Sequence, residues 1–190
     1  RGLSTLSGPA WVHHDGIGYV FPEQTALKLA QDAQAGSWNR ISRDLSAERV
    51  TAEVFSLWID HGKQPELGRY AYFIVPGIEA QALEGYARKS EIVILKNTPE
   101  CQAVRHSGLK LTGAIFYKPG LIEAEGAQSM GVNQSCILFA REVEAGKLRL
   151  AVCKPDGERK VTVRIGAQAV EMNLPDGDHA QKTVVQEIQL

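Results

Sequence analysis

Apolar and polar residues alternate with a period of two along most of the chain, the pattern of β-strands that bury one face. Residues 26–31 alternate in this way, and residues 50–60 do so over a longer stretch that adds the aromatic bulk favoured in sheets. Residues 69–75 are apolar at odd and even positions alike, so we expect that strand to be covered on both faces. The same period predicts strands at residues 11–15, 18–21, 38–41, 92–95, 102–105, 109–117, 135–142, 148–153, 160–165, 170–173 and 184–188.

Short runs of turn-forming residues separate these segments. Gly16-Ile17 lies between two strands and predicts a β-hairpin. Ala35-Gly36-Ser37 predicts a turn, and residues 61–68 predict a loop because they contain two glycines and a proline. Further turn signals are Lys118-Pro119-Gly120, Lys154-Pro155-Asp156-Gly157 and Pro175-Asp176-Gly177.

One segment has helical rather than strand spacing. In residues 79–88 the apolar positions Ala80, Leu83 and Ala87 fall on one helical face, and Gly85 predicts that the helix is short. The pattern as a whole therefore predicts an all-β protein made of antiparallel β-sandwich layers with one short helix near residues 79–88. A turn at Asn97-Thr98-Pro99 suggests a division into two domains, residues 1–97 and 98–190.

Composition narrows the classes of partner. The 190 residues are 44% hydrophobic and 23% charged, with a net charge of -1 and no stretch dense in Lys or Arg, which excludes a surface built to track nucleic-acid phosphates. The longest apolar runs, residues 70–76 and 136–140, are too short to span a bilayer, so we expect no membrane partner. The chain begins at Arg1 without a signal-peptide pattern, and we expect it to be a piece of a longer protein.

Cys101, Cys136 and Cys153 lie in or beside apolar stretches and lack C-x-x-C spacing. We expect them to be buried as small apolar residues, although spacing leaves open whether one pair is bridged.

Two histidine clusters are candidates for chemistry. His13-His14-Asp15 lies in a predicted strand, where adjacent side chains point to opposite faces, so the two imidazoles cannot readily share a metal. Asp60-His61-Gly62 ends a strand and enters a loop, but no nucleophile motif accompanies it. We therefore expect no catalytic residue, no metal site and no cofactor.

The segment Trp38-Asn39-Arg40 is the best candidate for contact with a carbohydrate. A Trp face stacks on sugar rings, and Asn and Arg supply hydrogen bonds to hydroxyls and carboxylates. The alternative is a core Trp after a turn, the packing role that we assign to Trp11 and Trp58.

Several segments together resemble polysaccharide lyase family 8, the hyaluronate, chondroitin and xanthan lyases. Four of them, in order, resemble the end of the family's central β-sandwich domain: residues 11–21 (WVHHDGIGYVF), 36–41 (GSWNRI), 55–62 (FSLWIDHG) and 70–77 (YAYFIVPG). Two more, residues 97–104 (NTPECQAV) and 148–155 (LRLAVCKP), resemble its small C-terminal β domain. The resemblance thus implies that residues 1–97 belong to a galactose-mutarotase-like sandwich and residues 98–190 to a smaller β-sandwich.

The family resemblance also implies a function for a parent protein. Members cleave uronic-acid-containing polysaccharides by β-elimination, using a Tyr, a His, an Asn and an Arg on an N-terminal helical domain. We expect this chain to be a non-catalytic part of a secreted or periplasmic bacterial enzyme, with an acidic polysaccharide and that helical domain as partners. A free-standing carbohydrate-binding or adhesion module, and a purely structural sandwich fragment, are the alternatives.

Overall fold

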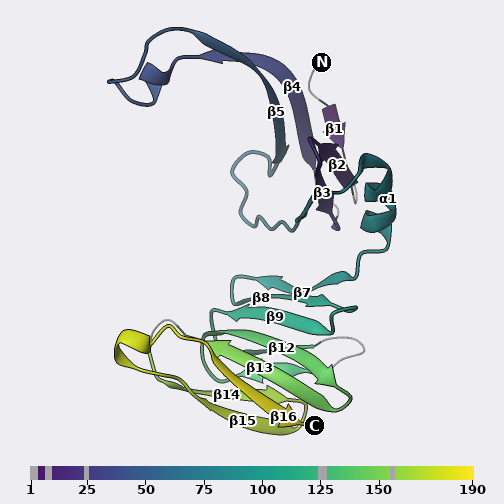
Figure 1. The fold of residues 1–190 in the computed structure, drawn as a ribbon, viewed down its shortest axis with the longest axis vertical. Coiled ribbons are helices and arrows are strands. Elements are labelled where there is room, and N and C mark those ends of the chain that lie inside the picture. Colours follow the sequence, from purple (N-terminus) through teal and green to yellow (C-terminus); the bar gives the residue numbers. More distant parts are fainter. Residues whose placement is uncertain (1–3, 7–9, 24–25, 124–127, 155–156) are drawn as a thin grey trace. The chain divides into compact units, whose positions relative to one another are not determined.

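The computed structural model describes residues 4–6, 10–23, 26–123, 128–154 and 157–190. The chain forms two compact units, Arg1–Lys89 and Ser90–Leu190 (Figure 1). The segment Asn97-Thr98-Pro99 lies in a hairpin between the first two strands of the second unit, β7 (Ile92–Thr98) and β8 (Cys101–His106). Asn97 and Thr98 end β7, and Pro99 and Glu100 form the turn. The all-β class with one short helix is confirmed.

Two small antiparallel sheets build unit 1. One has the order β1-β4-β5 and the other the order β2-β3-β6. The strands are β1 (Ser4–Leu6), β2 (Ala10–His14), β3 (Ile17–Phe21), β4 (Leu27–Gly36), β5 (Val50–Ile59) and β6 (Phe73–Pro76).

The hairpin between β2 and β3 turns at Asp15 and Gly16, one residue earlier than the predicted break. Both residues have positive φ, 47° and 73°, as a two-residue type I′ turn requires. Ile17 is therefore the first residue of β3.

The helix α1 (Ala80–Arg88) covers one face of the β2-β3-β6 sheet, as its contacts with β2 and β3 require. Leu83 is its one buried residue, at 1% exposure, and lies over Gly18 of β3. A Cβ on Gly18 would lie 2.6 Å from Leu83 Cδ1, so the absence of a side chain there lets the helix approach the sheet closely. The Arg88 guanidinium lies 5.9 Å from the ring centroid of Trp11, which adds a cation–π contact.

Unit 2 is a sandwich of a larger and a smaller antiparallel sheet. The larger has the order β16-β13-β12-β9-β8-β7 and the smaller the order β10-β11-β14-β15. Besides β7 and β8, the strands are β9 (Leu111–Phe116), β10 (Gly120–Ile122), β11 (Met130–Val132), β12 (Cys136–Glu144), β13 (Lys147–Cys153), β14 (Lys160–Ile165), β15 (Gln168–Asn173) and β16 (Val184–Gln189).

The core of unit 2 lies between its two sheets. Inward residues alternate with outward ones along the strands, and fully buried side chains such as Leu150 and Val152 of one sheet belong to the same cluster as Val163 and Met172 of the other. The two-residue period in the sequence predicted the longer of these strands, such as β14, because each buries alternate residues.

The three cysteines are free thiols. Cys101 and Cys136 both align with Phe116 on the strand between them, so two strand spacings, about 9.5 Å, separate their backbones, beyond disulfide reach. Both are buried, as predicted, whereas Cys153 is only partly buried and its thiol donates to the Gln181 carbonyl at 3.2 Å. Burial raises the pKa of the Cys136 thiol to about 11.

Several predicted boundaries are wrong. Residues 35 and 36 continue β4, and Trp38–Arg40 is a short 3-10 helix rather than a strand. The strand predicted at residues 69–75 begins only at Phe73, and Ile74 is 54% exposed, so its outer face is not fully covered. The three-residue strands β1, β10 and β11 were not predicted, because three residues carry too little periodicity. Part of the turn predicted at residues 154–157 lies outside the described residues.

Candidate functional site

The hairpin of β4 and β5 is the longest feature of unit 1. It pairs ten residues, from Leu27 with Ile59 at its base to Gly36 with Val50 at its outer end. Leu27 is fully buried, whereas residues 31–35 and 50–53 are exposed. The outer part of this hairpin and its connecting loop, residues 31–54, is called the arm below. The five exposed residues 31–35 of β4 alone extend about 17 Å, at about 3.4 Å per residue.

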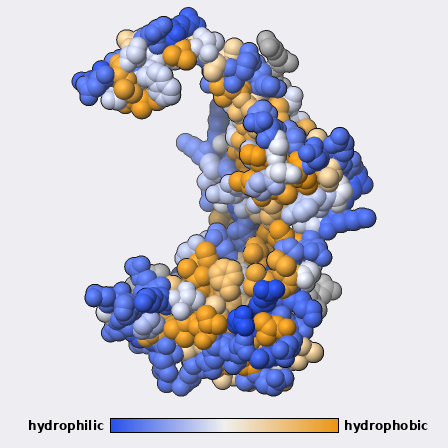
Figure 2. Space-filling view, in the orientation of Figure 1, coloured by the Kyte–Doolittle hydropathy of each residue, from blue (hydrophilic) through white to orange (hydrophobic). Residues whose placement is uncertain are grey.

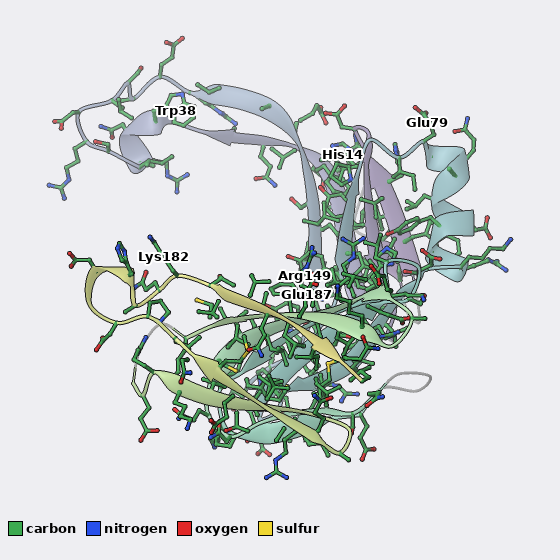
Figure 3. The ribbon with its side chains drawn as sticks, turned by 60° about the horizontal axis from the view of Figure 1, so that its bottom comes forward. His14, Trp38, Glu79, Arg149, Lys182 and Glu187 are labelled. Atoms are coloured by element: carbon green, nitrogen blue, oxygen red, sulfur yellow. The ribbon has the colours of Figure 1, made fainter. Side chains whose placement is uncertain are left out.

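The end of the arm carries the predicted carbohydrate-contact segment. Trp38 is 56% exposed and lies at the far end of the hairpin from His14 (Figure 3). Ile41 and Leu45 of the same loop are also exposed, at 78% and 49%, and Figure 2 shows hydrophobic surface at this tip beside hydrophilic residues. At this exposure Trp38 is not a core residue, so the packing alternative for Trp38 is wrong.

Asn39 has a structural task in this loop. Its backbone N–H donates to the Ser46 carbonyl at 2.9 Å, and its side-chain Nδ2 donates to the Arg43 carbonyl at 3.0 Å. These two bonds join opposite sides of the loop and hold Trp38 and Arg40 at its tip.

Arg40 lines a small hollow at the base of the loop. The hollow has a volume of about 260 Å³ and also contains Ser37 and Arg49. Two guanidinium groups and a hydroxyl can bind a carboxylate or sulfate group, which guanidinium recognises through paired hydrogen bonds. Trp38 and Arg40 therefore place an aromatic face and a cationic hollow on one loop.

A second concave feature lies at the base of the hairpin, between the two sheets of unit 1. This aromatic groove has a volume of about 520 Å³, within the range of small-molecule sites. β3 contributes Tyr19 and Phe21, and β5 contributes Phe55 and Leu57, each pair lying two residues apart and hence on one face of its strand. The loop from Asp60 to Tyr72 supplies His61, Tyr70 and Tyr72. β5 also supplies Trp58, which is 41% exposed, so the packing role predicted for it is wrong.

The aromatic rings of the groove form a continuous series. Ring centroids of Phe21 and Tyr72 are 5.9 Å apart, those of Tyr72 and Tyr70 are 6.2 Å apart, and those of Tyr70 and His61 are 6.2 Å apart. Tyr70 and Tyr72 are 56% and 46% exposed, so one side of each ring is accessible. Aromatic faces with hydroxyl and imidazole edges suit a ligand that is apolar on its faces and polar at its rim, as a sugar ring is.

The Asp60 carboxylate contacts groups other than the His61 ring. It accepts from Lys28 Nζ at 2.5 Å and from the Gly62 backbone N–H at 2.9 Å. The hydrogen bond from Lys28, followed by that from Gly62, holds the pKa of Asp60 below its ordinary value. Asp60 therefore ends the strand and shapes the turn, while His61 lines the groove.

His13 and His14 point to opposite faces of their sheet, as strand geometry predicted. His13 Nε2 lies 2.9 Å from the Ile78 carbonyl, before α1, whereas the His14 ring stacks on Phe55 with centroids 4.0 Å apart. Among the described residues no group of three His, Cys, Asp or Glu side chains could hold a metal ion. In the same part of the chain, no helix is long and apolar enough to cross a membrane.

Two sequence models of one enzyme family match this chain in succession. The model described as "Polysaccharide lyase family 8, super-sandwich domain" matches residues 1–87, and the one described as "Polysaccharide lyase family 8, C-terminal beta-sandwich domain" matches residues 93–162. The chain belongs to polysaccharide lyase family 8. Its two matched regions follow the same order as its two compact units.

The family 8 chain has curated relatives that act on different polysaccharides, to judge by their names. Chondroitinase-AC of Pedobacter heparinus is 36% identical over 188 residues, covering 93% of this chain and 26% of that protein. Xanthan lyase of Bacillus sp. is 29% identical over 170 residues, covering 85% of this chain and 18% of that protein. The family 8 chain therefore spans about a quarter or less of these two relatives.

Solved structures resemble the family 8 chain over nearly its whole length. A structure of chondroitinase AC lyase, from work on enzyme–oligosaccharide complexes, has a TM-score of 0.90 at 31% identity, covering 97% of this chain and 28% of that one. A Paenibacillus xanthan lyase structure has a TM-score of 0.84 at 21% identity and covers all of this chain and 21% of that one, which supports the fold alone.

The sequence pattern predicted a contact role for Trp38, Asn39 and Arg40 but did not predict the aromatic groove. Tyr70 and Tyr72 were assigned to a strand, and the predicted loop around His61 ended before them. Tyr70 and Tyr72 alternate with apolar neighbours in the sequence. A strand and the extended loop that lines the groove give this same alternation, so the pattern does not distinguish them. A run of aromatic residues beside a Gly- and Pro-containing loop is the one signal that could have indicated this site.

Proposed function

We propose that this chain is a non-catalytic β segment of a bacterial polysaccharide lyase that cleaves uronic-acid-containing polysaccharides by β-elimination. The observation that carries the proposal is the ordered match of two β-domain models from one lyase family. Relatives named chondroitinase, xanthan lyase and hyaluronate lyase support an acidic polysaccharide as the substrate of the parent enzyme. Its helical catalytic domain is then the partner of this segment, and the parent is secreted or periplasmic.

The exposed arm supports a role beside the substrate cleft. A two-stranded ribbon that is exposed on both faces has little stability of its own, so a ribbon of this kind is expected to pack against another surface. Trp38 at its tip offers a face for a sugar ring, and Arg40 and Arg49 offer positive charge for a carboxylate. Trp38, Asn39 and Arg40 are accordingly the proposed carbohydrate-contact residues, with Asn39 acting through the shape of the loop.

The first test measures catalysis by the isolated chain. β-Elimination leaves an unsaturated sugar that absorbs ultraviolet light, so the 190-residue chain is incubated with hyaluronan, chondroitin and xanthan and the absorbance is followed. We expect no product above a control without protein, while a complete family member yields product under the same conditions. Product formation by this chain would overturn the proposal and direct attention to His61 and Tyr70, whose rings adjoin in the groove.

A second candidate function is that of a carbohydrate-binding module that acts without cleavage. The observation in its favour is the aromatic groove of about 520 Å³, which could bind glycan without any contribution from a catalytic domain. Tight binding of an oligosaccharide by the chain alone, lost in Trp38→Ala or Tyr72→Ala with the fold intact, would favour this function. Leu45→Ala, which removes an exposed side chain of the arm without an aromatic face, is the matched control.

A further inference from the structure

Unit 2 contains a cavity that the proposed function does not use. It lies at one end of the sandwich, has a volume of about 500 Å³, and is lined from both sheets. The larger sheet contributes Arg105 of β8 and Leu148 of β13, and the smaller contributes Met130 of β11. This cavity is called the end pocket below.

Arg105 is unusual in its position within the sandwich. Strand register aligns it with Thr112 and, one strand further, with Ala140, which are 1% and 2% exposed, so Arg105 belongs to the inner face of the larger sheet. Its Nη1 donates to Thr112 Oγ1 at 3.2 Å, which fixes the guanidinium at the wall of the pocket. A guanidinium has five N–H donors in a planar fork, so this bond leaves most of them for a ligand.

The charges of the end pocket favour an anion. Lys110 also lines it, and its Nζ lies 3.0 Å from Glu142 Oε1, so these two groups neutralise each other. Within the described residues no side-chain carboxylate forms an ion pair with Arg105, so its remaining N–H groups can bind an anionic ligand. A half-buried cation without a counter-charge is costly unless an anion joins it.

The remaining walls suit a sugar ring rather than a bare ion. Met130 and Leu148 are buried apolar side chains that can contact the faces of a ring, and Gln128 offers an amide for its hydroxyls. The volume falls within the range of about 300–1,000 Å³ that small-molecule sites occupy. A carboxylate is planar and matches the guanidinium fork with two parallel hydrogen bonds.

We propose that the end pocket binds a carboxylate-bearing sugar residue of an acidic polysaccharide, with Arg105 as the group that recognises the carboxylate. The site belongs to unit 2 and uses none of the residues of the arm or the aromatic groove. The choice of a sugar as ligand rests on the proposed function, whereas the recognition of an anion rests on Arg105 itself.

The test follows amide chemical shifts of the ¹⁵N-labelled 190-residue chain during titration with a hyaluronan hexasaccharide. We expect shifts at Gln128, Gly146 and their neighbours, and binding weakened at least about tenfold by Arg105→Gln, as for the loss of a charged hydrogen bond. A hexasaccharide whose carboxyl groups have been reduced should bind weakly to the unaltered chain. Its affinity should equal that of the intact hexasaccharide for the Arg105→Gln variant. The matched control is Arg164→Gln, since Arg164 lies on the outer face of β14 between the buried Val163 and Ile165.

A second variant acts in the opposite direction. Glu142→Gln frees Lys110 to join Arg105, so the hexasaccharide should bind more tightly, and this result does not depend on whether Arg105→Gln folds. Equal binding by the intact and reduced hexasaccharides, or no change in Glu142→Gln, would overturn the proposal. Shifts confined to unit 1, including the Trp38 indole, would also overturn it while leaving the proposed function intact.

Discussion

The contact between Gly18 and Leu83 supports a prediction in which two destabilising substitutions partly cancel. Leu83→Ala removes the one buried side chain of α1 and should destabilise unit 1 by about 2–3 kcal/mol. This is the lower half of the range for buried Leu, because a nine-residue surface helix can settle into part of the space.

The substitution Gly18→Ala should cost about 1–2 kcal/mol by overpacking. The new Cβ would lie 2.6 Å from Leu83 Cδ1 and 2.8 Å from Ile78 Cγ2, too close for carbon atoms, and Leu83 at 1% exposure has no free space into which to rotate. In the double variant the new methyl group occupies part of the cavity that Leu83→Ala leaves. We therefore expect the double variant to be more stable than the sum of the single effects predicts, by about 1 kcal/mol.

The assay is urea unfolding followed by tryptophan fluorescence. All three tryptophans, at positions 11, 38 and 58, belong to unit 1, so the signal reports this unit without a contribution from unit 2. Leu67→Ala is the control, because Leu67 is 97% exposed and its loss should change the free energy of unfolding by less than about 0.5 kcal/mol. Single effects that add to within about 0.3 kcal/mol would refute the reasoning, since uncoupled residues do not share a contact.

Three further predictions concern charge, thiols and a turn. Hydrogen bonds from Lys147 and Arg149 hold the pKa of Glu187 in the folded chain below its ordinary value, and Figure 3 shows Arg149 beside Glu187. The ionised Glu187 therefore stabilises unit 2 at a pH above the pKa that this residue has in the unfolded chain. The stabilisation is lost as the pH falls through the lower pKa of the folded chain. Glu187→Gln should therefore lower the Tm measured by circular dichroism at pH 7 but hardly at pH 3, and a difference independent of pH would contradict this cause. A thiol reagent should label Cys153 first in the folded chain, because Cys153 is only partly buried. The pKa of about 11 at Cys136 leaves only about one in 10⁴ of its thiols ionised at pH 7. Equal labelling rates for Cys153 and Cys136 would contradict this prediction. Gly16→Ala should destabilise unit 1 by about 1 kcal/mol in urea unfolding, because residue 16 has a φ of 73° that alanine adopts only with strain. No steric clash contributes, since no atom lies within 4 Å of the added Cβ. Unchanged stability would show that the turn adapts.

Local pattern was enough to predict most strands of the fold. A strand such as β14 buries alternate residues, and this period of two is present in the sequence whatever the strand pairs with. The helix at residues 80–88 could also be predicted from local sequence, because its apolar residues have helical spacing. Its one buried residue, Leu83, lies on the face that this spacing defines.

Features that depend on contacts between residues far apart in the chain could not be predicted from the sequence pattern. The turn at Asn97-Thr98-Pro99 has the same local chemistry in a hairpin as in a linker, and only the pairing of β7 with β8 shows which it is. The aromatic groove likewise arises where Tyr72 meets Phe21, residues about fifty positions apart. The end pocket needs the register that turns Arg105 inward, which no single strand reveals.

The strand β5 has a consequence for handling the protein in solution. It forms one edge of its sheet, so one row of its backbone N–H and C=O groups is not paired within that sheet. Its ten residues include several β-branched and aromatic side chains and a single charge, at Glu53. Such an edge can pair with the same strand of a second molecule, and this pairing begins aggregation. The purified chain should consequently lose solubility as its concentration rises, and a lysine placed at the exposed Thr51 should delay that loss.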